Sequence, residues 1–129
     1  KQLMKHLILI IGLTFFIGCA FNQPLTLNHS KTVGKSIHEA ASDGDTESVK
    51  KHLALGTDVN LKDELGWTPL HWASSKVHNK TSKFLIKMGA EVNIVNKDGL
   101  SPLDYAENEM FGILIDHGAK SGIELRSSK

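Results

Sequence analysis

The sequence of 129 residues has little cysteine and no marked excess of charge of either sign. It has one cysteine, so no internal disulfide can form and a disulfide-stapled fold is excluded. Lys and Arg number 15 against 14 Asp and Glu, and without a basic excess nucleic acid is not an expected partner. Hydrophobic residues at 40% and charged residues at 22% exclude a disordered chain and a protein with several membrane spans. We therefore expect one small globular domain.

Residues 1–18 have the pattern of an export signal peptide. A basic start precedes the apolar run 7–17, whose eleven residues are too few to span a bilayer, which takes about 20. Phe-Ile-Gly at 16–18 then precedes Cys19, and this resembles the lipobox of a bacterial lipoprotein. The resemblance implies that Cys19 is lipid-modified. It also implies a place in the bacterial cell envelope, as an outer-membrane lipoprotein facing the periplasm, because Ala20 follows the cysteine.

Two alternatives to lipidation stay open. Cys19 can be incidental to a plain secretory signal, which would leave a secreted or periplasmic protein, or the apolar run can be a short anchor that is not cleaved. Residues 19–33 are polar and lack a sustained period, which predicts a lipid-anchored tether. At its end Gly34-Lys35-Ser36 imitates a phosphate-binding loop, but His29 occupies the position of a required glycine. Nucleotide binding is not expected.

From residue 34 onward the sequence repeats itself every 33 residues. The offset aligns residues 66–70, Gly-Trp-Thr-Pro-Leu, with residues 99–103, Gly-Leu-Ser-Pro-Leu. It also aligns several separate positions, namely Ile37 with Leu70 and Leu103, His38 with His71, Ala40 with Ala73 and Ala106, Gly56 with Gly89, and Asn60 with Asn93. A period of this length predicts a stack of repeats over residues 34–120. Residues 121–129 fall outside the repeats, and we expect them to form a polar tail.

The repeat resembles the ankyrin repeat. Thr68-Pro69-Leu70-His71 and the alanine at 73 have its T-P-L-H-x-A signature at its period. Thr68 can cap a helix that begins with Pro69, and Gly56 and Gly89 each follow an apolar stretch that a left-handed residue can close. The resemblance implies an all-α solenoid of about three helix-turn-helix repeats with β-turn tips.

Three departures from the family pattern carry structural expectations. Lys35-Ser36-Ile37-His38 replaces T-P-L-H in the first repeat, which predicts an N-terminal cap. Val77 stands where the family usually has a turn glycine, so the neighbouring residues must help to form the turn. Between Ala106 and Ile113 four residues are missing, because Gly118 follows Gly89 by 29 residues and not 33. One helix of the last repeat must therefore be short.

The residues predict neither an enzyme nor a metal site. No serine lies in a Gly-x-Ser-x-Gly elbow, and the one cysteine lies at the end of the signal. Seven histidines are present, but none are spaced as zinc ligands. By the resemblance, His38 and His71 are structural and fix their turns. We expect no cofactor, no metal and no small-molecule substrate.

Protein recognition is the remaining class of function, because a solenoid presents a long concave face. Leu65 and Trp67 stand out as apolar anchors at a turn tip, although Trp67 can instead fold back on its own helix. We rank Trp72 below Trp67 as a contact residue, because its side chain can lie partly in the core and partly on the binding face. Carried over by position, the partner-binding residues are Lys62, Glu64, Leu65, Trp67, Trp72, Ser75, Lys76, Lys97 and Leu100, with less certain counterparts at Val95, Asp98, Ser42 and Asp43.

Two functional hypotheses follow from the sequence. The favoured one is a non-enzymatic adaptor or an inhibitor, such as an immunity-type binder, which is anchored in the envelope and captures a protein partner on the concave face. The alternative is a structural lipoprotein scaffold that self-associates and has no dedicated ligand. The sequence names no partner, because ankyrin specificity lies in surface residues without a general code.

Overall fold

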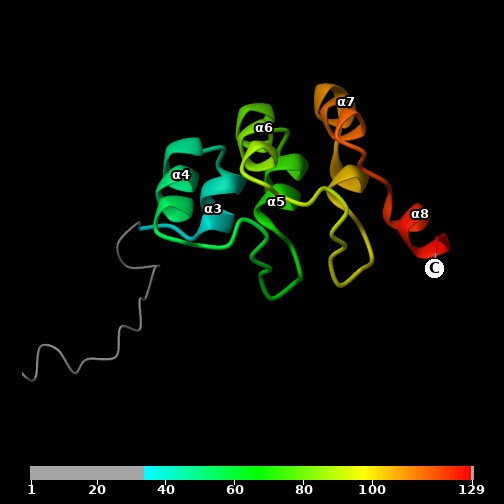
Figure 1. Ribbon diagram of the computed structural model, residues 1–129, viewed down its shortest axis with the longest axis horizontal. Helices are drawn as coiled ribbons and strands as arrows, with labels where there is room; N and C mark the ends of the chain where they lie inside the picture. Colours follow the sequence, from blue (N-terminus) through cyan, green and yellow to red (C-terminus); the bar gives the residue numbers. More distant parts are fainter. Residues whose placement is uncertain (1–33, 129) are drawn as a thin grey trace, which may run out of the picture.

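The computed structural model describes residues 34–128, which form an all-α stack of repeats (Figure 1). The signal peptide, Cys19 and the tether predicted over 1–33 lie outside the described residues. Inner helices alternate with outer helices along the chain. The inner ones are α3 (Ile37–Ser42), α5 (Pro69–Ser75) and the 3-10 helix η1 (Pro102–Tyr105), and the outer ones are α4 (Thr46–Ala54), α6 (Asn79–Lys87) and α7 (Asn108–Asp116). No strand occurs within the described range, so the predicted fold class is confirmed.

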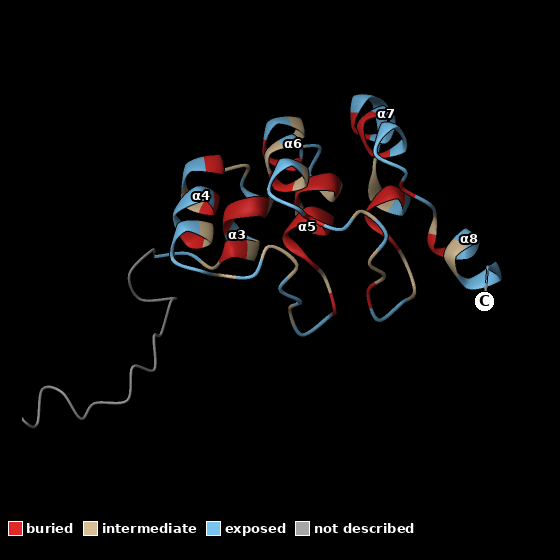
Figure 2. Cartoon of the chain, in the orientation of Figure 1, coloured by how far each residue is buried: buried red, intermediate tan, exposed pale blue. Residues whose placement is uncertain are grey.

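The core lies between the two rows of helices (Figure 2). Ala40 and Ala73 of the inner helices are fully buried, and their small side chains let neighbouring repeats approach closely. Leu85 and Leu114 of the outer helices fill the space behind them. Burial is thus shared between repeats, and no single repeat could bury its own apolar face. Among the described residues, no helix is long and apolar enough to cross a membrane.

Local sequence explains where the inner helices begin. Thr68 caps α5 through its side chain, and Pro69 occupies the first helical position, where its missing N–H is not needed. In the first repeat Ser36 caps α3 in a reciprocal pair with Glu39, with Ser36 N donating to Glu39 Oε2 at 2.7 Å. The predicted N-terminal cap therefore has its own capping box. Ser101 begins the third inner helix in the same way.

Left-handed residues end the outer helices and turn the chain between helices. Gly56 and Gly89 have φ values of +87° and +94°, as the sequence pattern predicts. Val77 also adopts a left-handed conformation, at φ +56°, in the turn between α5 and α6. It occupies the position that Gly44, at φ +72°, fills in the first repeat. The turn is thus made without glycine, at a cost in backbone strain because valine is β-branched.

The last repeat is shortened in its inner helix. η1 has four residues and ends at Tyr105, whereas α7 keeps the nine residues of α4 and α6. Relative to the second repeat, three of the four missing residues are lost from the inner helix and one from the turn that follows it, so one helix is short, as expected. Residues 121–129 contain a further helix, α8 (Gly122–Ser127), which begins with a capping box between Ser121 and Glu124. Gly122 N donates to Asp104 Oδ2 at 2.7 Å and joins α8 to the third repeat.

Candidate concave binding face

Two loops project beside the inner helices, the first before α5 and the second before η1 (Figure 1). Each loop is closed by one polar side chain. In the first loop, Asp63 Oδ1 accepts hydrogen bonds from the backbone N–H groups of Leu65 and Trp67, both at 2.9 Å. In the second, Asn96 Oδ1 accepts from those of Asp98 and Leu100, both at 3.0 Å. Such side-chain turns hold a loop in one conformation. The tips are therefore rigid features of the surface.

The two loops are also joined to each other. Lys97 N donates to Leu65 O at 3.1 Å, and Lys62 Nζ donates to Val95 O at 3.3 Å. Leu65 lies at this junction and is 57% exposed. The loops thus form one continuous ridge along the concave side, with an apolar side chain at its tip.

Three aromatic rings form a row behind this ridge. The ring of Trp67 lies between those of Trp72 and Tyr105, with centroid distances of 4.6 and 4.5 Å. All three side chains are half-buried. Trp67 therefore folds back on the inner helices, as the alternative reading allowed, and is not a freely exposed side chain. The reason is that Trp72 and Tyr105 occupy equivalent helix positions, 33 residues apart, and leave room for one ring between them.

The loop residues fix these rings in place. Trp72 Nε1 donates to Asp63 Oδ2 at 2.8 Å, and Asn96 Nδ2 donates to Tyr105 Oη at 2.8 Å. Asp63 and Asn96 are equivalent in the 33-residue register, as are the two aromatic residues. The second and third repeats thus each tie their loop to their inner helix through one polar pair, with donor and acceptor exchanged between the two repeats. The pKa of Asp63 is lowered below its ordinary value by the hydrogen bonds from Trp72, Trp67 and Leu65, which outweigh the opposing and larger single effect of burial.

His71 connects consecutive repeats. Its Nδ1 accepts from Thr68 N at 3.1 Å and from Thr68 Oγ1 at 2.9 Å, while Nε2 donates to Leu100 O at 3.2 Å. The ring is fully buried, and removal from water lowers its pKa to about 4. It is therefore neutral near pH 7. His38, its counterpart in the first repeat, is half-buried and donates from Nε2 to Leu61 O at 2.8 Å.

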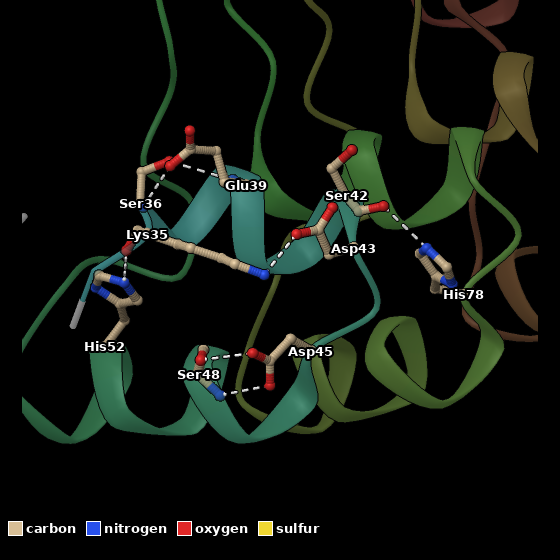
Figure 3. Close-up of polar contacts among 9 residues, drawn as sticks. All are labelled: Lys35, Ser36, Glu39, Ser42, Asp43, Asp45, Ser48, His52 and His78. Atoms are coloured by element: carbon tan, nitrogen blue, oxygen red, sulfur yellow. Dashed lines mark hydrogen bonds and ion pairs between the residues drawn. The ribbon is translucent and has the colours of Figure 1, made fainter.

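In the first repeat, polar side chains extend the concave face (Figure 3). Lys35 crosses α3 and forms an ion pair with Asp43 at 2.7 Å. At the C-terminal end of α3, His78 of the next repeat donates from Nε2 to Ser42 O at 2.9 Å. A hollow of about 650 Å³ lies in front of α3 and reaches Asp63 and Trp72. The concave face therefore runs from α3 to the aromatic row.

Comparison with known proteins decides the family. The family model described as ankyrin repeats, in three copies, matches residues 37–124, which is more than half of the chain. The chain belongs to the ankyrin-repeat family. The match reaches the start of α8, beyond the repeat domain expected from the sequence.

Curated relatives match short stretches of this chain. Protein phosphatase 1 regulatory subunit 12A of Mus musculus is 48% identical over 48 residues, 37% of this chain and 5% of that protein. Protein VAPYRIN-LIKE of Medicago truncatula is 51% identical over 43 residues, 33% of this chain and 9% of that protein. Ankyrin repeat domain-containing protein 40 of Mus musculus is 40% identical over 55 residues, which are 42% of this chain and 15% of that protein. The chain thus matches only a small part of each relative's length.

Family membership indicates a non-catalytic protein-interaction module, since ankyrin repeats present an extended concave binding surface. Within residues 34–128, no three His, Cys, Asp or Glu side chains gather as ligands for a metal ion.

The structure places the sequence-predicted contact residues in two groups. Lys62, Glu64, Leu65 and Lys97 are exposed on the loop ridge, and Lys76 is exposed at the end of α5. The half-buried ones are Trp67, Trp72, Ser75 and Leu100. The carbonyl of Leu100 accepts from His71, and Ser75 Oγ donates to Trp72 O at 3.0 Å, so both also serve the ankyrin scaffold.

Sequence reasoning missed three residues of this face, namely Asp63, Asn96 and Tyr105. The signal was present, because the 33-residue offset aligns Asp63 with Asn96 and Trp72 with Tyr105. An aspartate or asparagine at a loop start, nine residues before an aromatic in both repeats, indicates a side-chain pair across the loop. Only the structure shows that donor and acceptor exchange.

Proposed function

We propose that the ankyrin face captures one protein partner and that the chain acts as an adaptor or inhibitor anchored in a bacterial envelope. The observation that carries the proposal is the aromatic row beside the loop ridge. Trp67, Trp72 and Tyr105 are half-buried, and two of them are held by hydrogen bonds with loop side chains, Trp72 with Asp63 and Tyr105 with Asn96. Aromatic anchors that are rigid before binding lose little conformational entropy when a partner covers them.

Leu65 supplies the apolar tip of the same surface. Its side chain is 57% exposed, next to the half-buried aromatic row. Lys62, Glu64 and Lys97 surround it with exposed charges of both signs. An apolar centre with a charged rim is the usual composition of a protein interface. This arrangement favours a protein partner over a small molecule, which would need a deeper pocket.

Affinity capture from a solubilised envelope fraction tests the proposal. The bait is the full chain, compared with Leu65→Arg and with Met88→Arg as a matched control. Met88 is 48% exposed at the end of α6, on an outer helix. We expect a protein that binds the full chain and the Met88 variant at 1:1 stoichiometry, and that binds the Leu65 variant at least about tenfold more weakly. Equal retention by both variants, or no retained protein, would contradict the concave-face proposal and favour a scaffold without a ligand.

Envelope anchoring is the second part of the proposal, and it is supported by the sequence of residues 1–19. A lipid on Cys19, followed by about thirteen tether residues, would hold the ankyrin domain up to roughly 45 Å from a membrane. Metabolic labelling with a fatty-acid analogue tests this step. We expect the label on the full chain and its loss in Cys19→Ser. A labelled Cys19→Ser protein, or an unlabelled full chain, would contradict lipidation at this residue.

A further inference from the structure

Charge is distributed unevenly along the outer row of helices, which lies on the side of the stack away from the loop ridge (Figure 1). α4 and α6 together carry five lysines and one glutamate, and all six side chains are exposed. α7, the next outer helix, carries two acidic residues and no lysine or arginine. The outer row is therefore basic over α4 and α6 and acidic at α7. We call the five lysines the basic outer face, namely Lys50, Lys51, Lys80, Lys83 and Lys87.

Helix register points all of these lysines outward. α4 and α6 have nine residues each, and the lysines occupy positions two, five, six and nine, which span an arc of about 100° on a helix. The opposite side of both helices is buried, with Val49 and Ser82 at position four and His52 and Leu85 at position seven. The lysines thus lie on the surface that faces away from the core.

The lysines form one patch because α4 and α6 lie side by side. Thr46 Oγ1 and Thr81 Oγ1 are joined by a hydrogen bond of 2.8 Å between the two helices. On the outward side, Lys50 Nζ of α4 lies 5.7 Å from the centre of the Phe84 ring of α6. Residues that are about 30 positions apart in the sequence therefore share one surface, which explains why the sequence alone shows no basic cluster.

The few acidic residues nearby leave most of this positive charge unpaired. Lys50 pairs with Glu47 at 2.7 Å and Lys83 pairs with Glu109 of α7 at 3.1 Å, and both pairs are exposed and screened by water. The other three lysines of the face form no ion pair with a described residue. The face therefore offers cations to an anionic partner without a buried pair having to break.

The chain enters the fold at the basic end of the stack. His52, which is buried on α4, donates from Nε2 to Lys35 O at 2.6 Å and fixes the first described residues beside this helix (Figure 3). A segment that leads from a membrane to Gly34 thus reaches the stack next to α4, and not next to the acidic α7.

We propose that the basic outer face docks on the anionic headgroups of the membrane that holds the N-terminal segment. The proposal rests on the envelope anchoring proposed above, which supplies the membrane, and goes beyond it by setting the orientation of the domain. Each lysine near an anionic surface strengthens binding about fivefold, and a tether raises the local concentration of the face. The loop ridge and the aromatic row then point away from the membrane and stay open to a protein partner.

The composition of the face favours lipid headgroups over nucleic acid. α4 and α6 contain no arginine, the residue that binds phosphate in a fixed bidentate geometry, whereas lysine is a point charge that suits mobile headgroups. Phe84 is the one aromatic residue of these two helices, and it is half-buried beneath Lys50 and not free to stack on a base. Met88, 48% exposed at the end of α6, adds an apolar side chain that can enter the interfacial layer.

Lysine acetylation on vesicles tests the docking. The full chain is mixed with vesicles of phosphatidylcholine, with vesicles that contain about one-third phosphatidylglycerol, or with duplex DNA. A water-soluble acetylating reagent is then followed at each lysine by mass spectrometry. Wild type is compared with two triple variants of equal helix content. The outer variant is Lys51→Glu, Lys80→Glu and Lys87→Glu, and the control variant makes the same charge change at exposed lysines outside the outer helices, Lys76→Glu, Lys97→Glu and Lys120→Glu.

The reporters are Lys50 and Lys83, which every one of these chains keeps. In wild type and the control variant we expect both to react at least about fivefold more slowly on anionic than on neutral vesicles. In the outer variant we expect equal rates on the two kinds of vesicle. Salt at about 1 M should remove the difference, because it shortens the Debye length to about 3 Å. Lys62 on the loop ridge is the internal reference and should react alike on both.

Equal rates at the reporters in wild type would overturn the docking, and so would protection that persists in the outer variant or extends to Lys62. Protection by DNA and not by anionic vesicles would also overturn it, in favour of nucleic acid. Labelling of Cys19 reports the anchoring separately. If Cys19 is labelled and the reporters are not protected, only the docking is lost, whereas protected reporters on an unlabelled chain remove only the anchoring.

Discussion

Mild acid should destabilise this fold through one buried histidine, His71. Its ring is fully buried, accepts at Nδ1 from Thr68 and donates from Nε2 to the carbonyl of Leu100. A second proton would have to enter at Nδ1, where it would meet two donors. Burial, helped by the charge of Lys62, lowers the pKa of His71 to about 4 from the ordinary value of 6.5.

The sign and size of the effect follow from proton linkage. Between pH 6.5 and 4 the unfolded chain binds more protons at this site than the folded chain, so the free energy of unfolding falls as the pH falls. From pH 7.5 to pH 5 the loss is about 2 kcal/mol. A domain of this size has roughly 5–15 kcal/mol of stability, so the midpoint of urea unfolding should fall visibly.

Urea unfolding followed by circular dichroism at pH 7.5 and pH 5 measures the loss. His71→Gln is the control, since glutamine at this position can still accept from Thr68 N in a capping box but does not titrate. The pKa values of Glu39 and Asp45 are lowered by their hydrogen bonds to Ser36 and Ser48, so their contributions are lost mainly below pH 5. Wild type should lose about 2 kcal/mol more than the variant over this interval. Equal losses would refute the assignment to His71.

Three further predictions concern stability. Val77→Gly should raise the free energy of unfolding by about 1 kcal/mol, seen as a higher thermal midpoint, because glycine adopts the left-handed conformation without strain. Asp63→Asn should lower it by about 2 kcal/mol in urea unfolding, because an amide can accept either from the loop backbone or from Trp72 but cannot serve both. Ser121→Ala should cost about 1 kcal/mol locally by removing the α8 cap with Glu124, seen as faster hydrogen exchange over 122–127 with the rest of the chain unchanged.

The fold could be predicted because its determinants are local and recur. Thr68 and Pro69 set the start of a helix, and Gly56 and Gly89 set the ends, whatever surrounds them. The shortened last repeat also follows from counting the residues between Gly89 and Gly118. These features depend on backbone chemistry within a few residues, which the sequence displays directly.

The candidate site could be predicted only in part, because exposure depends on neighbours from other repeats. The sequence alone favours Trp67 as an exposed residue of a loop tip. In the structure its ring lies between those of Trp72 and Tyr105. The helix α8 was not expected either, since six residues with one capping box give too weak a periodic signal. Phe111 is half exposed although the equivalent residues Val49 and Ser82 are buried, because no outer helix follows α7 among the described residues.

The exchanged polar pairs explain how an aromatic surface can face water and remain ordered. An unpinned indole or phenol ring on a concave face would sample several rotamers, and a partner would have to restrict them at a cost of roughly 0.5–1.5 kcal/mol per side chain. Asp63 and Asn96 already meet part of that cost while also closing their own loops. Because one residue in each of these two repeats does both, loop shape and ring position cannot vary independently. The concave face therefore behaves as a preformed surface, which favours recognition of a partner segment that has a defined shape of its own.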